Sequence, residues 1–362
     1  MQADHAARLE RLRHALDEEE VPAAVLTSAP SVRWLTGFSG TNGQALVLPD
    51  TLFLITDERY EERARAEAPD AELVLDRDWQ QVVVDRCRDV GLDEVGFESD
   101  GLTHAAGEDL AEALDDAGID ALALRDVVQE LRQVKDAAEL GLLAAACAIT
   151  DQSFEALLPH AVPGRTEREL ARILLRSMED LGAEGAAFPP IVAGGPNSAV
   201  PHHAPTDRPL ARGDLLKLDF GARVAGYHAD MTRTVSLGDP GDDELVRIYG
   251  IVRAAQQAGV DAAKPDTRAG DVDAACRDLI EHAGYGERFV HGTGHGVGLE
   301  IHEAPWVSAG ATGRLAAGTV ITVEPGVYLP GRGGVRIEDT VAVTADGSPR
   351  CLTTSPRELL RL

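Results

Sequence analysis

The chain has 362 residues, of which 44% are hydrophobic, so it can build large cores and is not an intrinsically disordered protein. Its 34 basic and 61 acidic residues give a formal net charge of −27. This balance argues against binding to nucleic acid or to an anionic membrane, because both need basic patches. The length suggests two or three domains.

Targeting and cysteine signals both indicate a cytoplasmic protein. Residues 1–5 lack the basic and apolar segments of a signal peptide. The longest apolar run, residues 142–149, is much shorter than the roughly 20 residues that span a bilayer. Four cysteines are scattered without a Cys-x-x-Cys pair: Cys87, Cys147, Cys276 and Cys351. We expect them to be reduced and buried as small apolar residues.

Residues 1 to about 125 alternate helical and extended patterns, which is typical of an α/β domain. Apolar periodicity predicts, in chain order, a helix over 5–20, strands over 23–26, 44–48 and 51–56, a helix over 58–66, a strand over 95–97 and a helix over 110–117. The glycine-rich segment 37–43 does not place G-x-G-x-x-G between a strand and a helix, so we interpret it as a turn.

The segment 127–158 is predicted to be helical throughout and to mark the domain boundary. Leu131 and Leu142 lie on its apolar side, and Pro159 ends it. Beyond it the pattern changes to helices interleaved with pairs of strands.

The second half contains an internal repeat built on pairs of acids. In each copy a glycine precedes the first acid by six residues and another glycine follows it by two. A second acid comes 11 or 14 residues later, and a threonine follows that acid by two. The four acids are Asp219, Asp230, Glu324 and Glu338. Each copy is predicted to form a β-hairpin with one carboxylate per strand, which indicates a pseudo-twofold domain with the acids at its centre.

Strand alternation places these acids on one side. Val335 and Ile337 share the core face, so Glu338 points away from the core, and the same alternation holds for the other three acids. Four carboxylates in a partly dry pocket would repel one another or take up protons, whereas two divalent cations would neutralise them. Such a pair of ions generates hydroxide from water, which is the chemistry of hydrolysis.

Histidines are concentrated in two segments. Residues 291–303 contain His291, His295 and His302, and four glycines between them make a helix improbable. We therefore expect backbone that closely approaches other backbone, with an imidazole free to reach a metal. His202 and His203 lie in a proline-punctuated loop, and one of these two could be a surface residue.

These motifs resemble the pita-bread metallopeptidases, and among them the Xaa-Pro peptidases prolidase and aminopeptidase P. The resemblance rests on residues 218–222 (LDFGA), 228–233 (HADMTR), 292–303 (GTGHGVGLEIHE), 323–326 (VEPG) and 335–339 (VRIED). Residues 33–43 (RWLTGFSGTNG) resemble the creatinase-like N-terminal domain of that family. The resemblance implies an α/β fold with a creatinase-like mixed-sheet domain over 1–125 and a pita-bread catalytic domain over 126–362.

The resemblance also implies roles for individual residues. It implies metal ligands at Asp219, Asp230, His295, Glu324 and Glu338. Asp230 and Glu338 would bridge two divalent ions, with Mn²⁺ favoured and Co²⁺, Zn²⁺ or Fe²⁺ as alternatives. The implied catalytic residues are His202, His291, His302, Arg336 and Glu324, the last also serving as proton shuttle.

The implied activity is hydrolysis of the bond between an N-terminal residue and a following proline in a di- or oligopeptide, by a cytoplasmic homodimer. Some prolidases carry an arginine shortly after the His-Glu of the motif, where it holds the dipeptide carboxylate. This chain has Ala304, Pro305 and Trp306 there, which favours tolerance of longer peptides. The alternatives are a non-catalytic pita-bread binding protein and a creatinase-type C–N hydrolase.

Overall fold

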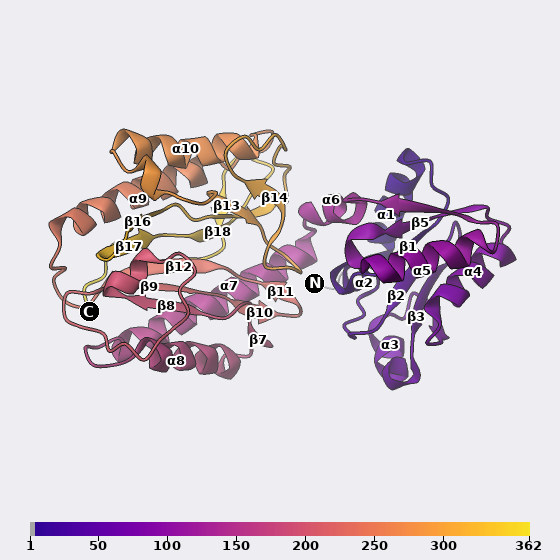
Figure 1. Cartoon of the computed structure of the whole chain (residues 1–362), viewed down its shortest axis with the longest axis horizontal. Coiled ribbons are helices and arrows are strands. Elements are labelled where there is room, and N and C mark those ends of the chain that lie inside the picture. The colour runs from indigo at the N-terminus through magenta and orange to yellow at the C-terminus, as the bar shows by residue number, and fades with distance from the viewer. Residues whose placement is uncertain (1–3) are drawn as a thin grey trace. The chain divides into compact units, whose positions relative to one another are not determined.

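The computed structural model describes residues 4–362, so residues 1–3, part of the segment without a signal-peptide pattern, lie outside the described residues. The described chain divides into two compact units, one ending at Arg132 and the other beginning at Gln133 (Figure 1). Both units combine helices and sheets, which confirms the predicted α/β class.

The N-terminal unit is built on one mixed sheet. Its strands are β1 (Ala24–Leu26), β2 (Gln44–Val47), β3 (Leu52–Thr56), β4 (Glu72–Leu75), β5 (Glu94–Glu98) and β6 (Asp120–Leu124). They are ordered β4-β3-β2-β1-β5-β6. The pairs β1–β2 and β2–β3 are antiparallel, whereas β3–β4, β1–β5 and β5–β6 are parallel. The predicted mixed-sheet domain is therefore confirmed.

Periodicity predicts three of this unit's helices and misses two that begin with clear capping signals. The helices are α1 (His5–Glu18), α2 (Ala29–Thr36), α3 (Glu61–Glu67), α4 (Trp79–Asp89) and α5 (His104–Asp115). The missed helix α2 follows the capping hydroxyl of Ser28 and has Pro30 in its first turn. The missed helix α4 follows the capping carboxylate of Asp78 and packs Val83 and Cys87 into the core of the sheet.

The predicted continuous helix over 127–158 is wrong, because two helices occupy this stretch. Helix α6 (Val127–Gln133) ends before Val134, which makes an isolated β-bridge. Helix α7 (Ala137–Leu157) then begins with a capping box, in which Asp136 and Glu139 each accept hydrogen bonds from the other's backbone amide. The cap starts a new helix, so apolar periodicity alone overlooked the break.

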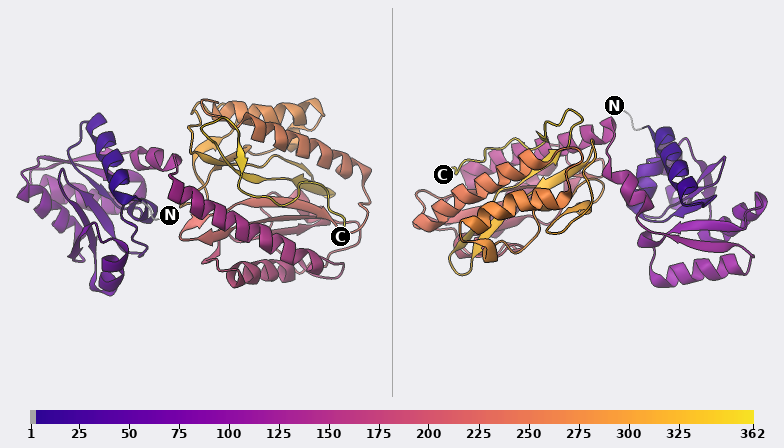
Figure 2. Two further views of the ribbon diagram at one scale, coloured as in Figure 1. Left: turned by 180° about the vertical axis from the view of Figure 1, so that it is seen from behind. Right: turned by 90° about the horizontal axis from the view of Figure 1, so that it is seen from above.

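The C-terminal unit consists of two similar halves. Its strands are β7 (Gly185–Ala186), β8 (Ile191–Gly194), β9 (Leu215–Phe220), β10 (Ala222–Val224), β11 (Tyr227–His228) and β12 (Met231–Ser236) in the first half, then β13 (Gly294–Gly296), β14 (Glu303–Val307), β15 (Val320–Val323), β16 (Gly326–Leu329), β17 (Gly333–Arg336), β18 (Asp339–Ala342) and β19 (Arg350–Cys351). The central sheets are β12-β9-β8 and β14-β13-β15-β18-β19. Helices α7 and α8 (Glu167–Asp180) lie on one side of the strands, and α9 (Asp243–Ala262) and α10 (Ala269–His282) lie on the other (Figures 1 and 2).

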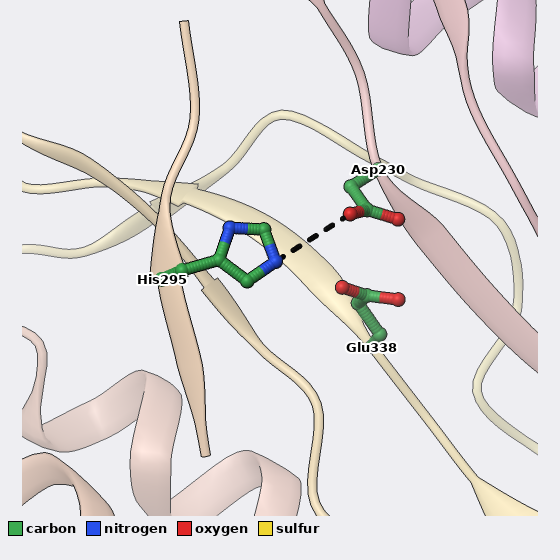
Figure 3. Close-up of side chains that lie close together, drawn as sticks. All are labelled: Asp230, His295 and Glu338. Atoms are coloured by element: carbon green, nitrogen blue, oxygen red, sulfur yellow. Dashed lines mark ion pairs between the residues drawn. The ribbon is translucent and has the colours of Figure 1, made fainter. Parts of the chain in front are cut away.

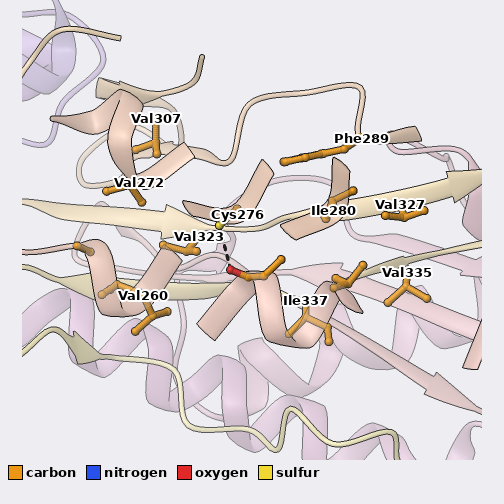
Figure 4. Packing of buried hydrophobic residues seen from close by; sticks show 14 of the residues in the cluster. Val260, Val272, Cys276, Ile280, Phe289, Val307, Val323, Val327, Val335 and Ile337 are labelled. Carbon is orange, nitrogen blue, oxygen red and sulfur yellow. Dashed lines mark hydrogen bonds between the residues drawn. The ribbon is translucent and has the colours of Figure 1, made fainter. Parts of the chain in front are cut away.

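Each half has its own apolar core. In the second half, Val323 and Ile337 pack beneath α9 and α10, where the thiol of Cys276 lies 3.1 Å from the carbonyl oxygen of Ala255 (Figure 4). In the first half, Leu218 packs against α7 and α8. The four cysteines are free, and three of them are buried. The apolar residues that alternate with the acids belong to these two cores, which confirms the predicted alternation of core and non-core faces.

By length and composition, one helical stretch among the described residues, Ala137–His160, would be long and apolar enough to cross a membrane. It contains α7, which packs against α8 and the strands β10 and β11. The buried carboxylate of Asp151 on this helix accepts hydrogen bonds from the amides of Thr354 and Ser355. These contacts are those of a core helix in a folded unit.

Glycines of the segment 291–303 allow neighbouring strands to approach very closely. A Cβ atom at Gly294 would lie 2.0 Å from the carbonyl oxygen of Thr322, and one at Gly296 would lie 2.1 Å from that of Ala304. The segment forms the strand β13 and not a helix. The prediction of closely approaching backbone is confirmed.

We predict that Gly296→Ala destabilises the C-terminal unit by at least about 2 kcal/mol, because the new methyl group meets a backbone atom that cannot rotate away. For a unit of this size the melting temperature should fall by about 4–8 °C in a thermal scan. Gly313→Ala is the matched control, since a Cβ atom there meets no atom within 4 Å. Equal melting temperatures for both variants would contradict the prediction.

Candidate metal centre

Four acids occupy equivalent places on two antiparallel strand pairs. Asp219 lies near the end of β9, opposite Thr232 of β12, and Asp230 immediately precedes β12. In the second half Glu324 directly follows β15, and Glu338 directly precedes its antiparallel partner β18. Each half therefore brings one acid from each strand to the same end of the pair, as the repeat predicts.

The threonines of the repeat join the two halves. The hydroxyl of Thr232 donates to Oε2 of Glu338 at 2.7 Å, and the hydroxyl of Thr340 donates to the carbonyl oxygen of Asp230 at 2.8 Å. The amide of Glu338 also donates to the carbonyl oxygen of Thr232 at 3.1 Å. Each threonine thus holds the second acid of the opposite half, which explains its place in both copies.

His295 projects from β13 toward Asp230 and Glu338 (Figure 3). One side-chain ligand atom from each of these three residues lies within 4.8 Å of the others. The Nε2 atom of His295 lies 3.7 Å from Oδ2 of Asp230 and 3.4 Å from Oε1 of Glu324. Its Nδ1 atom lies 3.0 Å from the carbonyl oxygen of Gly296. A proton on Nδ1 would be held by that carbonyl, which leaves Nε2 available as a metal ligand.

The surroundings of the acids give them very different pKa values. Burial, reinforced by the negative charge of neighbouring acids, raises the pKa values of Asp230 and Glu338 well above their ordinary range. Burial also acts against ionisation of Glu324, but its hydrogen bond with His295 and the nearby positive charge lower its pKa to about 2. The cluster therefore contains carboxyl groups that cannot all ionise cheaply in the protein alone.

Two oxygens of this cluster lack a hydrogen-bond donor among the described residues. Oδ1 of Asp219 and Oε1 of Glu338 are buried and have no hydrogen-bond partner there. An orphaned buried carboxylate oxygen is costly unless a cation takes its lone pair. Four carboxylates and one imidazole form a hard, oxygen-rich donor set that suits divalent ions of the first transition row. The residues present therefore fit a divalent metal centre.

The cluster opens into a cavity of about 730 Å³. Every residue predicted for the site lines this cavity: His202, Asp219, Asp230, His291, His295, His302, Glu324, Arg336 and Glu338. The structure therefore brings together residues that lie up to 136 positions apart in the sequence, from His202 to Glu338.

A hydrogen-bonded chain that the sequence analysis missed runs beside the acids. The guanidinium of Arg336 pairs with Asp219 and donates to the hydroxyl oxygen of Tyr328 at 2.8 Å. That hydroxyl lies 2.8 Å from Nε2 of His291. Burial raises the pKa of Tyr328 to about 12, so the phenol stays protonated. The signal was available, because β16 and β17 pair antiparallel and place Tyr328 and Arg336 diagonally on one face.

The histidines that flank His295 are held neutral. Burial lowers the pKa values of both His291 and His302. The ring of His302 packs edge-on against that of His295, with the ring centroids 4.4 Å apart. Neutral imidazoles beside a cationic centre can donate hydrogen bonds to an oxygen that becomes negative during a reaction.

The two adjacent histidines of the loop differ in their contacts. His203 places its Nε2 atom 2.8 Å from Oε2 of Glu167 at the start of α8. His202 is exposed at the cavity wall. His202 is therefore the member of the pair that fits the surface alternative, whereas the contact with Glu167 ties His203 into the fold.

Comparisons with known proteins agree with this geometry. Residues 141–345 match metallopeptidase family M24, and residues 8–134 match the creatinase/prolidase N-terminal domain. The peptidase YqhT of Bacillus subtilis is 38% identical over 98% of this chain and 100% of its own length. The solved structure of an Xaa-Pro dipeptidase from Bacillus anthracis has a TM-score of 0.95 at 39% identity, covering 99% of this chain and 100% of that one.

An X-Pro aminopeptidase from Thermotoga maritima has a solved structure with a TM-score of 0.89 at 34% identity, covering 98% of this chain and 99% of that one. The family matches span most of the chain, and the catalytic match includes all four acids and the five predicted histidine and arginine positions. Members of this family are metallopeptidases that use divalent metal ions, which agrees with the donor set described above. The chain belongs to metallopeptidase family M24 and carries the creatinase/prolidase N-terminal domain.

Proposed function

We propose that this protein is an Xaa-Pro peptidase, which hydrolyses the bond between an N-terminal residue and a following proline. The observation that carries the proposal is the convergence of four acids and five histidines on one cavity. Relatives over the full chain include proteins named Xaa-Pro dipeptidase and X-Pro aminopeptidase. A non-catalytic binding protein would have no need for this complete set, and creatinase lacks it.

The proposed ligands are Asp219, Asp230, His295, Glu324 and Glu338, with Asp230 and Glu338 shared between two ions. Support comes from their common cavity and from the close approach of Asp230, His295 and Glu338. When bound, two divalent ions supply an activated water and polarise the scissile carbonyl. We propose Mn²⁺ as the ion because the donors are mostly hard oxygens, with Co²⁺, Zn²⁺ and Fe²⁺ as alternatives.

The surrounding side chains would move the proton and hold the peptide. Glu324 lies beside the other acids and would accept a proton from the water, then pass it to the departing proline nitrogen. His291 and His302 are neutral and can donate to the oxygen that gains negative charge. His202 would contact the peptide from the opposite loop, and Arg336 would orient Asp219.

The cavity wall supports selection for proline and tolerance of peptides longer than two residues. Its larger apolar residues include Phe188, Pro189, Pro190, Ile191, Ile301 and Trp306. These surfaces suit a rigid ring that has no amide hydrogen. Among the described residues of the wall, Arg336 is the only arginine or lysine, and it is already paired with Asp219. Tyr227, whose hydroxyl donates to Glu139 at 2.9 Å, is not among the residues that line the cavity.

The proposal extends to the setting of the enzyme. Free, mostly buried cysteines agree with a reducing cytoplasm. The homodimer follows from the family resemblance alone, and sedimentation analysis of the purified protein would measure it.

We predict that the stabilisation by Mn²⁺ grows as pH rises. Without metal, the raised pKa values of Asp230 and Glu338 make the folded state bind more protons than the unfolded state above about pH 4. Their contribution to stability is therefore present at low pH and lost as pH rises through the folded pKa values. Metal needs the ionised acids and acts in the opposite direction.

The measurement is the melting temperature at pH 5 and pH 7.5, with chelator and with Mn²⁺. The metal-induced increase should be larger at pH 7.5. Glu338→Gln is the control, because it removes one titrating group and should flatten the pH dependence of the chelated protein. A metal-induced shift that is equal at both pH values would contradict the prediction.

We predict that Asp230→Asn and Glu338→Gln reduce metal content more than Asp219→Asn does. A shared ligand serves both ions, whereas Asp219 would serve one. Elemental analysis should find fewer than one ion per chain in the first two variants and about one in the third, as expected for a two-metal site. Loss of both ions from Asp219→Asn, with both retained in Asp230→Asn, would show that the shared ligands are wrongly assigned.

We predict that the enzyme requires proline but accepts a tripeptide. The kcat/KM values for Ala-Pro, Ala-Pro-Ala and Ala-Ala-Ala are compared at saturating metal. Ala-Pro-Ala should be cleaved, and Ala-Ala-Ala should be at least about tenfold slower. Alanine in place of proline makes less contact with the apolar residues of the cavity wall. Equal rates for these two tripeptides would defeat the proline claim, and cleavage of Ala-Pro alone would defeat the length claim.

A variant at Trp306 tests the reason for length tolerance. Trp306→Arg places a cation at the cavity wall and should raise kcat/KM for Ala-Pro relative to Ala-Pro-Ala. Trp306→Phe is the matched control, since it keeps an uncharged aromatic ring. An identical ratio in the two variants would show that charge at this position does not set the preferred length.

A further inference from the structure

His202 stands between two chain neighbours that are both anchored by buried side chains. On one side, the carbonyl oxygen of Pro201 accepts hydrogen bonds from Nζ of Lys217 at 3.1 Å and from the guanidinium of Arg336 at 3.3 Å. On the other side, the ring of His203 contacts the carboxylate of Glu167 at 2.8 Å. The position of His202 thus depends on contacts made by its neighbours.

Glu167 is fully buried at the first residue of α8, and all five hydrogen-bond contacts of its carboxylate come from residues 194–206. Oε1 accepts from the amide of Gly194 and from the side-chain nitrogen of Asn197, both at 2.8 Å. Oε2 accepts from the amide of Thr206 at 3.0 Å and from its hydroxyl at 2.7 Å, and it contacts His203. One carboxylate therefore ties together both ends and the interior of the segment that carries His202.

This arrangement keeps a charge where burial alone would remove it. Burial opposes ionisation of Glu167, but the hydrogen bonds from Gly194, Thr206 and the other donors hold its pKa below the ordinary value. The positive end of the α8 dipole acts in the same direction. Among the described residues, none of the hydrogen-bond partners of this carboxylate is a proposed metal ligand, so its role is separable from metal binding.

We propose that Glu167 is a positioning residue that holds the segment 194–206 so that His202 meets the peptide. The inference rests on the proposed function, in which His202 contacts the substrate. Because a displacement of about 1 Å can cost a hundredfold in rate, a loosened segment should impair turnover without removing any group from the cavity. A residue that only stabilises the fold would act independently of His202.

A double-mutant cycle separates the two roles. The holoenzyme variants Glu167→Gln, His202→Ala and their combination are compared by kcat and KM for Ala-Pro-Ala, with metal content measured for each. Glu167→Gln should lower kcat/KM at least tenfold in the wild-type background and less than twofold in the His202→Ala background, with metal content unchanged. An equal loss in both backgrounds, or no loss in either, overturns the proposal.

Two further variants make the cycle specific. Glu179→Gln changes an exposed acid on the same helix and should leave kcat/KM unchanged. Thr206→Val removes one donor to Glu167 and covers the case in which Glu167→Gln fails to fold. It should lower kcat/KM about threefold, and only when His202 is present, since it loosens one of the five contacts. A loss that persists without His202 again overturns the proposal.

A spectroscopic measurement separates this inference from the proposed activity. In zinc-loaded protein with labelled histidines, the ring resonance of His202 is identified by its disappearance in His202→Ala. That resonance should shift or broaden in Glu167→Gln but not in Glu179→Gln. An unchanged resonance overturns the positioning role whatever the activity, whereas failure of the wild type to cleave any Xaa-Pro peptide overturns the proposed function alone.

Discussion

Mutual repulsion among four carboxylates in one buried cavity is the constraint on which the C-terminal unit depends. Burial and like charge raise the pKa values of Asp230 and Glu338, and a buried oxygen on Asp219 and one on Glu338 have no donor among the described residues. Such a cluster destabilises the fold unless cations complete it. The apolar cores of both halves and the hydroxyls that cross between them hold the acids together until metal can bind.

The duplicated architecture explains how one chain meets this constraint. Each half supplies two acids from one antiparallel strand pair. The two halves must therefore hold a fixed position relative to each other for the four acids to meet. Thr232 and Thr340 fix that position, because each hydroxyl binds the opposite half. The glycines at 294 and 296 let β13 approach its neighbours closely enough for His295 to reach the same point. These two glycines are therefore required because any side chain would keep the strands apart.

The sequence predicts those features that depend on residues close together in the chain, and it misses those that depend on contacts between distant residues. The four acids are marked by a repeated short pattern of glycine, acid and threonine. The side of the strand on which each acid lies follows from strand alternation. The break before α7 was also readable, since Asp136 and Glu139 form a capping box, but apolar periodicity concealed it. Glu167 is different: the sequence places it 27 to 39 residues from the groups it binds, and nothing in its local pattern distinguishes it from a surface acid.

The same reasoning explains why two adjacent histidines have different contacts. Both residues line the cavity, but His203 is held by a buried carboxylate and His202 is exposed, and no rule of local sequence separates them. The separation comes from tertiary structure, since α8 supplies one anchor and β9 supplies Lys217 as the other. Catalysis needs the metal ligands and the side chains that contact the substrate to be held with similar precision, because an error in either misplaces the reacting atoms. On the proposed function, the buried anchors of the segment 194–206 serve the same precision as the acids within the centre.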